Sequence, residues 1–198
     1  MTRIPPSRES PLRHATLNET LVALLDEAPS LDDAVGLVTS AIRKGLKPES
    51  IRSRVLRARD LRRRALILEI LADTEEGVES PLEYRFHHDV EDAHGLPQSV
   101  RQEWRKVGGR WIRSDCRYAG FGVVVELDGE LAHPGKATPA DLLRDNDVVL
   151  TAGEITLRYR WPHVAGTPCA VARQVATALT ARGWEGEIRA CGPRCGAV

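Results

Sequence analysis

Apolar residues recur at helical spacing through the first third of the chain. This period predicts one helix from Leu17, a second that follows Ser30, and a third helical stretch that starts at Pro48. Residues 16–78 are therefore predicted to form an α-helical module. The preceding residues, 1–15, are rich in proline, serine and charge and are expected to be a flexible leader.

The pattern changes after residue 77. Ser80-Pro81-Leu82-Glu83 is a typical helix start, with a polar cap, a proline at the first position and an acid three residues after the cap. Alternating stretches then predict strands at Arg101–Val107, Arg110–Arg117, Gly122–Asp128 and Glu154–Trp161. Helical periodicity returns from Pro139 to Gly153 and from Pro168 to Gly183. This order predicts an α/β domain over residues 79–185, followed by a cysteine-containing tail at 186–198.

Two acidic residues interrupt the apolar strand at 122–128. Glu126 and Asp128 share one face with Val124, because side chains alternate along a strand. Buried carboxylates are costly unless they are paired or bind a cation, and a hairpin brings Asp115 beside Glu126. Such a cluster suits Mg²⁺ and the hydrolysis of a phosphodiester. The alternative is that Asp128 begins a turn and that the other two are surface acids at strand ends.

An ordered set of short motifs extends this interpretation. The set is Ser80-Pro81-Leu82-Glu83, Gly95-Leu96-Pro97, Asp115, Val124–Gly129, His133, Arg144-Asp145-Asn146 and Leu157–Trp161. Over residues 79–185 it resembles bacterial endonuclease domains related to the very-short-patch-repair nuclease, within the PD-(D/E)xK restriction-endonuclease superfamily. The resemblance implies a restriction-endonuclease-like mixed sheet flanked by helices. In many relatives a winged-helix region similar to abortive-infection antitoxins precedes this domain, whereas here we expect only the helical module.

The resemblance also implies roles for individual residues. Asp115 and Glu126 correspond to the acids that bind Mg²⁺ or Mn²⁺, and Glu83 to an acid on the first helix that completes the metal site. Glu83 also stands at a capping position, which is the simpler explanation for it. Asp128 occupies the place of the motif lysine, which normally stabilises the attacking water and the developing charge. His133 is the local substitute as general base, with an ordinary solvated loop histidine as the alternative.

Four further polar residues are candidates for DNA contacts. Arg144 and Asn146 lie near the start of the helix at 139–153, where the resemblance implies contact with the scissile phosphate or the carboxylates. Arg158 and Arg160 alternate with apolar residues on the last strand and are expected to bind backbone phosphates. The alternative for Arg144 and Asn146 is an ordinary solvated helix face.

The charge of the chain is balanced overall and divided locally. The 198 residues carry 28 Lys+Arg and 28 Asp+Glu, so net charge gives no argument for nucleic-acid binding. Residues 43–64 are strongly basic and residues 65–94 strongly acidic. The arginines of the first segment can follow DNA or pair with the acids inside the fold, and we favour pairing.

Apolar runs in this sequence are too short for a membrane span, and the N-terminus lacks the apolar core of a secretory signal. We therefore expect no membrane partner and a cytoplasmic location.

The four cysteines raise the question of a second metal. Cys191 and Cys195 form a C-x₃-C pair in a Gly/Pro turn, compatible with a structural Zn²⁺ if Cys169 and an unidentified fourth ligand join them. Cytoplasmic disulfides are uncommon, although a redox-labile pair in the tail stays open. Cys116 is expected to face the core.

Together these patterns predict a Mg²⁺-dependent DNA endonuclease. The alternative is a non-catalytic DNA- or partner-binding protein on a degenerate nuclease fold, related to toxin–antitoxin or abortive-infection systems. The absent lysine favours this alternative, whereas Asp115, Glu126 and His133 favour the enzyme.

Overall fold

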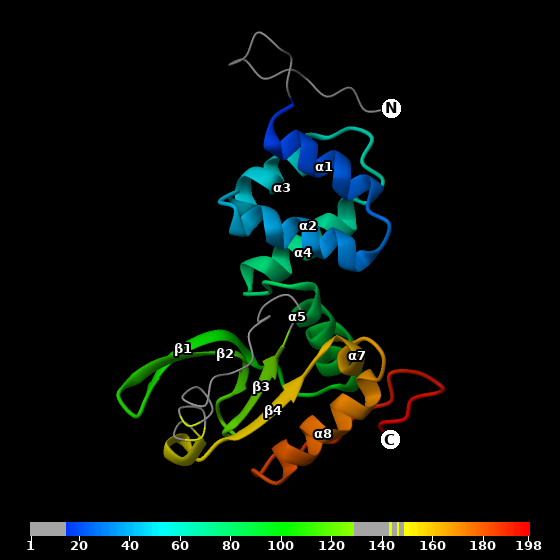
Figure 1. The fold of residues 1–198 in the computed structure, drawn as a ribbon. Coiled ribbons are helices and arrows are strands. Elements are labelled where there is room, and N and C mark those ends of the chain that lie inside the picture. Colours follow the sequence, from blue (N-terminus) through cyan, green and yellow to red (C-terminus); the bar gives the residue numbers. More distant parts are fainter. Residues whose placement is uncertain (1–14, 129–142, 144–145, 147–148) are drawn as a thin grey trace. The chain divides into compact units, whose positions relative to one another are not determined.

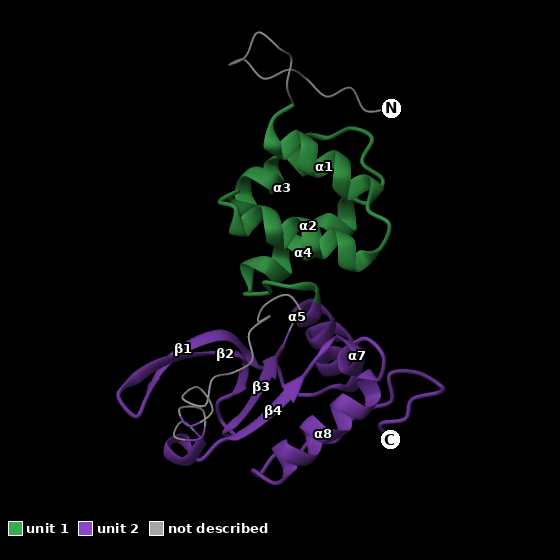
Figure 2. Cartoon of the chain, in the orientation of Figure 1, with its two compact units in different colours: residues 1–81 green, residues 82–198 purple. Residues whose placement is uncertain are grey.

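The chain divides into two compact units, residues 1–81 and 82–198, in the computed structural model (Figure 2). The structure describes residues 15–128, 143, 146 and 149–198. Among these residues, every helix is too short or too polar to cross a lipid bilayer.

The first unit is helical, as predicted. Its helices are α1 (Leu17–Glu27), α2 (Leu31–Arg43), α3 (Pro48–Arg57) and α4 (Arg64–Glu75). Polar caps fix the first two starts: the Thr16 hydroxyl accepts from the Glu19 N–H at 3.3 Å, and the Ser30 hydroxyl from the Asp33 N–H at 3.1 Å. Fully buried side chains such as Leu25 from these helices form the core of the unit.

Arginines of the basic segment pair within this unit, though only partly with the predicted acids. Arg52 binds Glu75 of the acidic segment at 2.8 Å. Arg62 instead pairs at 3.4 Å with Asp26, at the end of α1. The expectation of internal pairing is thus confirmed for Arg52, while Arg62 takes a different partner.

The second unit is a mixed α/β structure (Figure 1). Helical segments α5 (Pro81–Arg85) and η1 (Phe86–Asp92) precede the sheet. Its strands are β1 (Val100–Val107), β2 (Arg110–Tyr118), β3 (Val123–Leu127) and β4 (Ile155–Tyr159), followed by helices α7 (Trp161–Val164) and α8 (Pro168–Thr180). Strand order is β1-β2-β3-β4, antiparallel except for the parallel pair β3–β4. Of the predicted helix at 139–153, the structure describes residues 143, 146 and 149–153, and all of these except Gly153 are helical.

The apolar core of this unit lies between one face of the sheet and the helices η1, α7 and α8. Val123, Val125 and Leu127 of β3 point into it, as the alternation predicts. Cys116 of β2 is also completely buried there, so its predicted core position is confirmed. The opposite face of β3 carries the buried Val124 and the half-buried Glu126.

Two elements differ from the sequence-based prediction. The helix after Pro81 continues as a π-helix over Phe86–Asp92, a variation that is frequent at functional sites. Strand β4 ends at Tyr159 rather than Trp161, because Pro162 stands in the first turn of α7, where proline favours a helix start. Arg160 therefore stands at the N-cap position of α7 instead of lying on the strand, and Trp161 is 36% exposed.

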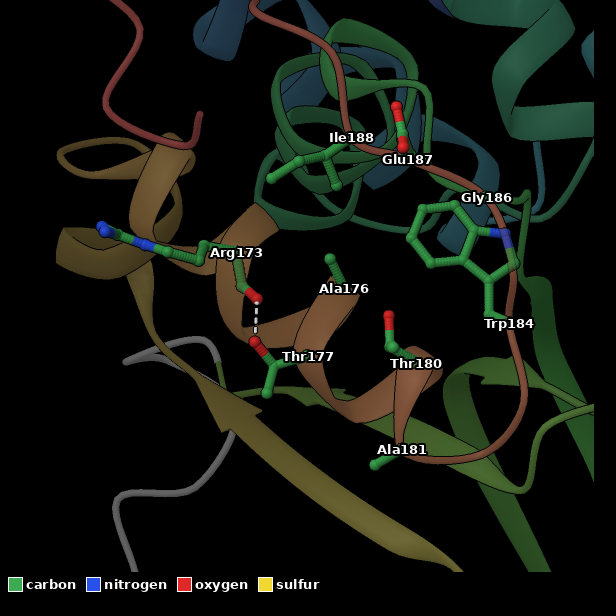
Figure 3. A pocket seen from close by; sticks show the side chains of 9 residues that line it. All are labelled: Arg173, Ala176, Thr177, Thr180, Ala181, Trp184, Gly186, Glu187 and Ile188. Carbon is green, nitrogen blue, oxygen red and sulfur yellow. Dashed lines mark hydrogen bonds between the residues drawn. The ribbon is translucent and has the colours of Figure 1, made fainter.

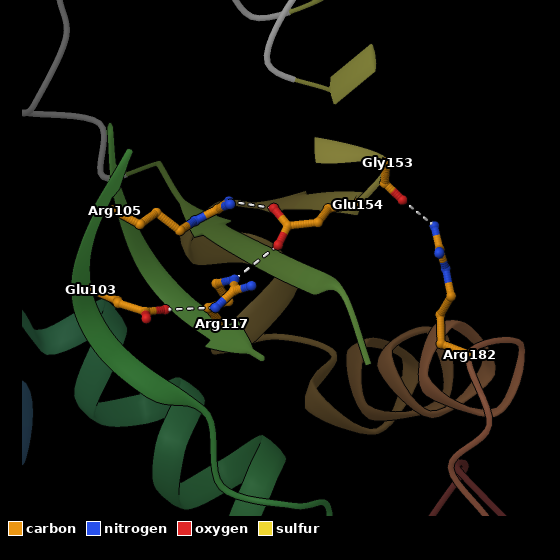
Figure 4. Close-up of polar contacts among 6 residues, drawn as sticks. All are labelled: Glu103, Arg105, Arg117, Gly153, Glu154 and Arg182. Atoms are coloured by element: carbon orange, nitrogen blue, oxygen red, sulfur yellow. Dashed lines mark hydrogen bonds and ion pairs between the residues drawn. The ribbon is translucent and has the colours of Figure 1, made fainter. Parts of the chain in front are cut away.

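The β1–β2 hairpin extends beyond the rest of the sheet, since β3 pairs only with Cys116–Tyr118 of β2. An ion-pair network fastens its base to the segment before β4 (Figure 4). Arg117 binds Glu154 at 2.8 Å and Glu103 at 3.1 Å, and Arg105 also binds Glu154. Glu154 is buried, so the ion pairs that hold the hairpin in place are largely shielded from solvent.

Candidate functional site

Acidic side chains from two distant elements meet at a glutamine of β1. The Gln102 Nε2 donates to Glu83 Oε2 at 3.0 Å and to Asp115 Oδ1 at 3.3 Å. Glu83 comes from α5 and is buried, whereas Asp115 comes from β2 and is half-buried. The structure therefore brings two of the predicted metal ligands to one place.

Asp115 lies where β2 separates from β3. The paired residues end at Cys116 and Val125, and the Asp115 Oδ2 accepts the next backbone N–H, from Leu127, at 2.8 Å. Continued by one residue, this register sets Asp115 opposite Glu126, with both side chains on the same face. The predicted proximity of Asp115 and Glu126 is confirmed.

Glu126 carries a strongly perturbed carboxyl group. Burial, and then the negative charges of Asp115 and Asp128, raise the pKa of Glu126 from 4.5 to about 7. Arg158, opposite Glu126 across the β3–β4 pair, acts in the other direction but does not compensate. At Glu126 of this acidic cluster (Glu83, Asp115, Glu126 and Asp128), burial and the neighbouring acids together outweigh the effect of the nearby arginines.

Asp128 stands where the resemblance places the motif lysine. It therefore contributes a negative charge where a lysine would contribute a positive one. Its carboxylate lies 3.9 Å from the Arg158 guanidinium, at the end of β3. It acts on Glu126 through its charge, which favours the protonated carboxyl.

Gln102 was not among the predicted site residues. Its backbone has a φ of +50°, which non-glycine residues rarely adopt, and the β1–β2 pairing skips it while keeping the same register on both sides. A strained residue that holds two carboxylates together is typical of a functional position. Nothing in the motif pattern identifies it, because the strain is visible only in the backbone.

The predicted DNA-contact residues and His133 are either exposed in the structure or lie outside the residues that it describes. Arg158 and Arg160 are exposed, with Arg158 next to the acidic cluster and Arg160 beyond the end of β4. Asn146 is helical and exposed, whereas His133 and Arg144 lie outside the described residues.

Another carboxylate buried in the same unit, Glu91, was also missed. Glu91, 1% exposed, is hydrogen bonded to His87 Nδ1 at 2.6 Å, to the Tyr118 hydroxyl at 2.6 Å and to the Ser99 N–H at 3.2 Å. Burial, and then the charge of Glu91, hold the pKa of the Tyr118 hydroxyl well above its ordinary value. This network is enclosed in the core and its partners come from the chain itself.

Three cysteines and one histidine form a separate cluster that could hold a metal ion. One ligand atom each from His94, Cys169, Cys191 and Cys195 lies within 4.8 Å of the others. The backbone N–H groups of Ala197 and Cys191 lower the pKa of Cys195 to about 6. The three cysteines that the sequence proposed are brought together, and His94 lies beside them, where the sequence left a fourth ligand unidentified.

A depression on the surface of α8 contains none of the predicted site residues (Figure 3). Trp184 folds back over Gly186, where a Cβ atom would approach the indole ring to 2.5 Å, so a larger residue there would displace the ring. The wall is formed largely by small residues of α8, including Ala176, Thr180 and Ala181. With few polar groups converging on it, the depression offers no chemistry comparable to that of the two clusters.

No protein-family model matches the chain, and no curated protein or solved structure matches it either.

Proposed function

We propose that residues 82–198 form a divalent-metal-dependent DNA endonuclease of the restriction-endonuclease-like class. The observation that carries this proposal is the convergence of Glu83, Asp115 and Glu126 from three separate elements, with the pKa of Glu126 raised to about 7 by burial and like charges. Carboxylates held together against their mutual repulsion are suited to a hard cation such as Mg²⁺ or Mn²⁺.

Carboxylate oxygens are the ligands that such a cation prefers. Glu83, Asp115 and Glu126 supply carboxylate oxygens, and a bound Mg²⁺ would supply Lewis-acid stabilisation of a phosphodiester and a more acidic water. The Leu127 N–H and the Gln102 amide orient the Asp115 carboxylate. Because Glu126 is a ligand in this proposal, it is not available as the proton acceptor, and His133 stays the sequence-based prediction for the general base.

The β1–β2 hairpin offers a surface suited to nucleic acid. Trp104 lies opposite Arg113 and Lys106 opposite Trp111, which places all four side chains on one face. The two indole rings are 62% and 67% exposed, and the Arg113 guanidinium lies 5.9 Å from the Trp104 ring centroid. Exposed aromatic rings between cationic side chains stack on bases and attract phosphates.

The second candidate function is DNA or partner binding without catalysis. Asp128 at the lysine position favours it, as does the fact that both Asp115 oxygens already accept hydrogen bonds. In that case the acidic cluster holds β1, β2 and α5 together, and the hairpin alone provides the function.

Nicking of supercoiled plasmid in Mg²⁺ or Mn²⁺ separates the two functions. We expect cleavage by the wild type and a loss of at least about 100-fold in Glu126→Gln, because a ligand to the metal is removed. Glu185→Gln is the matched control, since this exposed glutamate of the second unit belongs neither to the acidic cluster nor to the hairpin. Cleavage that persists in Glu126→Gln contradicts the proposed site, and plasmid binding without cleavage by the wild type supports the second candidate.

A further inference from the structure

We propose that one Zn²⁺ ion binds to His94, Cys169, Cys191 and Cys195. The ion fastens the C-terminal segment, residues 189–198, to the rest of the second unit. This inference does not rest on the proposed nuclease activity, because the Cys/His cluster shares no residue with the acidic cluster.

The sulfur separations match a tetrahedral centre. Cys169 Sγ lies 3.6 Å from Cys191 Sγ and 3.8 Å from Cys195 Sγ. Two thiolates on a tetrahedral zinc with Zn–S bonds of about 2.3 Å stand about 3.8 Å apart. Sulfur atoms in a disulfide are separated by only about 2.05 Å, and all four cysteines are free.

His94 is oriented as a zinc ligand. Its Nδ1 lies 3.1 Å from the Val90 carbonyl oxygen, which can only accept, so Nδ1 carries the proton and Nε2 keeps its lone pair. That Nε2 is buried without a hydrogen-bond partner, in a side chain with no solvent exposure. A histidine whose second nitrogen donates to a backbone carbonyl is the usual arrangement at a zinc site, and the metal would satisfy the remaining nitrogen.

The surrounding chain holds the ligands from three separate segments. His94 follows η1, Cys169 is in the first turn of α8, and the remaining two cysteines are in the C-terminal segment. The Arg189 N–H donates to the His94 carbonyl at 2.9 Å, which aligns that segment with the end of the helix. The Ala197 N–H donates to Cys195 Sγ at 3.4 Å, a contact suited to a thiolate.

The ligand set predicts a structural and not a catalytic ion. Three thiolates and an imidazole fill the four positions of zinc, so no position is open for water or substrate. Soft sulfur ligands also select zinc over Mg²⁺, which the acidic cluster would take. The second unit would therefore hold two chemically distinct metals at separate places.

Metal analysis of the purified full chain tests this site. We expect about one equivalent of zinc in the wild type, a tetrahedral thiolate-rich spectrum when Co²⁺ replaces it, and loss of both in Cys191→Ser. Cys191 is exposed, so this variant loses a ligand without losing core packing. His94→Ala should also lose the ion, whereas His88→Ala on the same helical segment is the control that should retain it.

Proteolysis gives a second readout that is independent of the metal content. Chelation of the wild type should speed tryptic cleavage after Arg189 or Arg194, because the released segment becomes accessible. Cys191→Ser should be cleaved at the fast rate whether or not chelator is present. A wild type that binds no zinc, a Cys191→Ser variant that retains it, or cleavage unaffected by chelation would each overturn the proposal.

Discussion

Two groups of carboxylates in the second unit are built in opposite ways. Glu91 is enclosed in the core. It accepts hydrogen bonds from the Tyr118 hydroxyl and the Ser99 N–H, and it is hydrogen bonded to the ring of His87. Glu126 is half-buried next to other acids, and burial together with those acids raises its pKa to about 7 despite the nearby arginines. The first group is satisfied by the chain itself, whereas the second is the group for which we propose a divalent cation.

This difference separates a structural role from a binding role for the same kind of residue. A buried carboxylate with a full set of donors stabilises its own fold, and its removal leaves those donors buried without a partner. Carboxylates that repel one another destabilise the folded protein until a cation binds. Loss of Glu91 should therefore affect stability, and loss of Glu126 should affect metal binding and pH dependence.

Glu91→Ala gives the largest expected effect. We expect the free energy of unfolding to fall by about 3–5 kcal/mol, because Tyr118, Ser99 and His87 lose a shared buried partner. Urea denaturation measures this change, and Glu91→Gln, which keeps an acceptor oxygen, should lose less. A loss in Glu91→Ala no greater than that in Glu126→Ala would contradict the comparison.

The pH dependence of stability gives a smaller effect at Glu126. Its pKa is raised from 4.5 to about 7 in the folded protein, so folding favours the protonated carboxyl and the free energy of unfolding falls as pH rises between those values. Relative to Glu126→Gln, the wild type should lose about 1–3 kcal/mol between about pH 4 and pH 8, with allowance for partial exposure of the carboxyl to solvent. Parallel pH profiles for the two proteins in urea denaturation would show that Glu126 is not perturbed.

Local pattern was sufficient to predict most of the scaffold and part of the acidic site. Alternation along β3 separates the buried Val123 and Val125 from Glu126, and the hairpin brings Asp115 opposite. The polar cap at Ser30 and the proline at position 81 mark the starts of two helices, because each acts within a single turn. Each of these signals depends on residues only a few positions apart, so a single sequence is enough to detect it.

Features that depend on the tertiary fold were not predicted. Gln102 joins the site through an unusual backbone angle, and His94 reaches the cysteines only after α8 and the C-terminal segment pack against the end of its helix. The Glu91 network likewise requires η1 to pack beside β2. The strand prediction through Trp161 was wrong because Pro162 fits a helix start better than a strand end.

Binding of Mn²⁺ to the metal-free acidic site is the most direct test of the central claim, that this cluster is a cation site. We would titrate Mn²⁺ by calorimetry into wild type, Glu126→Gln and Glu91→Gln, with equimolar Zn²⁺ present to occupy the thiolates. The account predicts one Mn²⁺ site in the wild type and in Glu91→Gln, weakened at least about tenfold in Glu126→Gln, since a carboxylate ligand is lost. Equal Mn²⁺ affinity in Glu126→Gln, or no Mn²⁺ binding by the wild type, would contradict it.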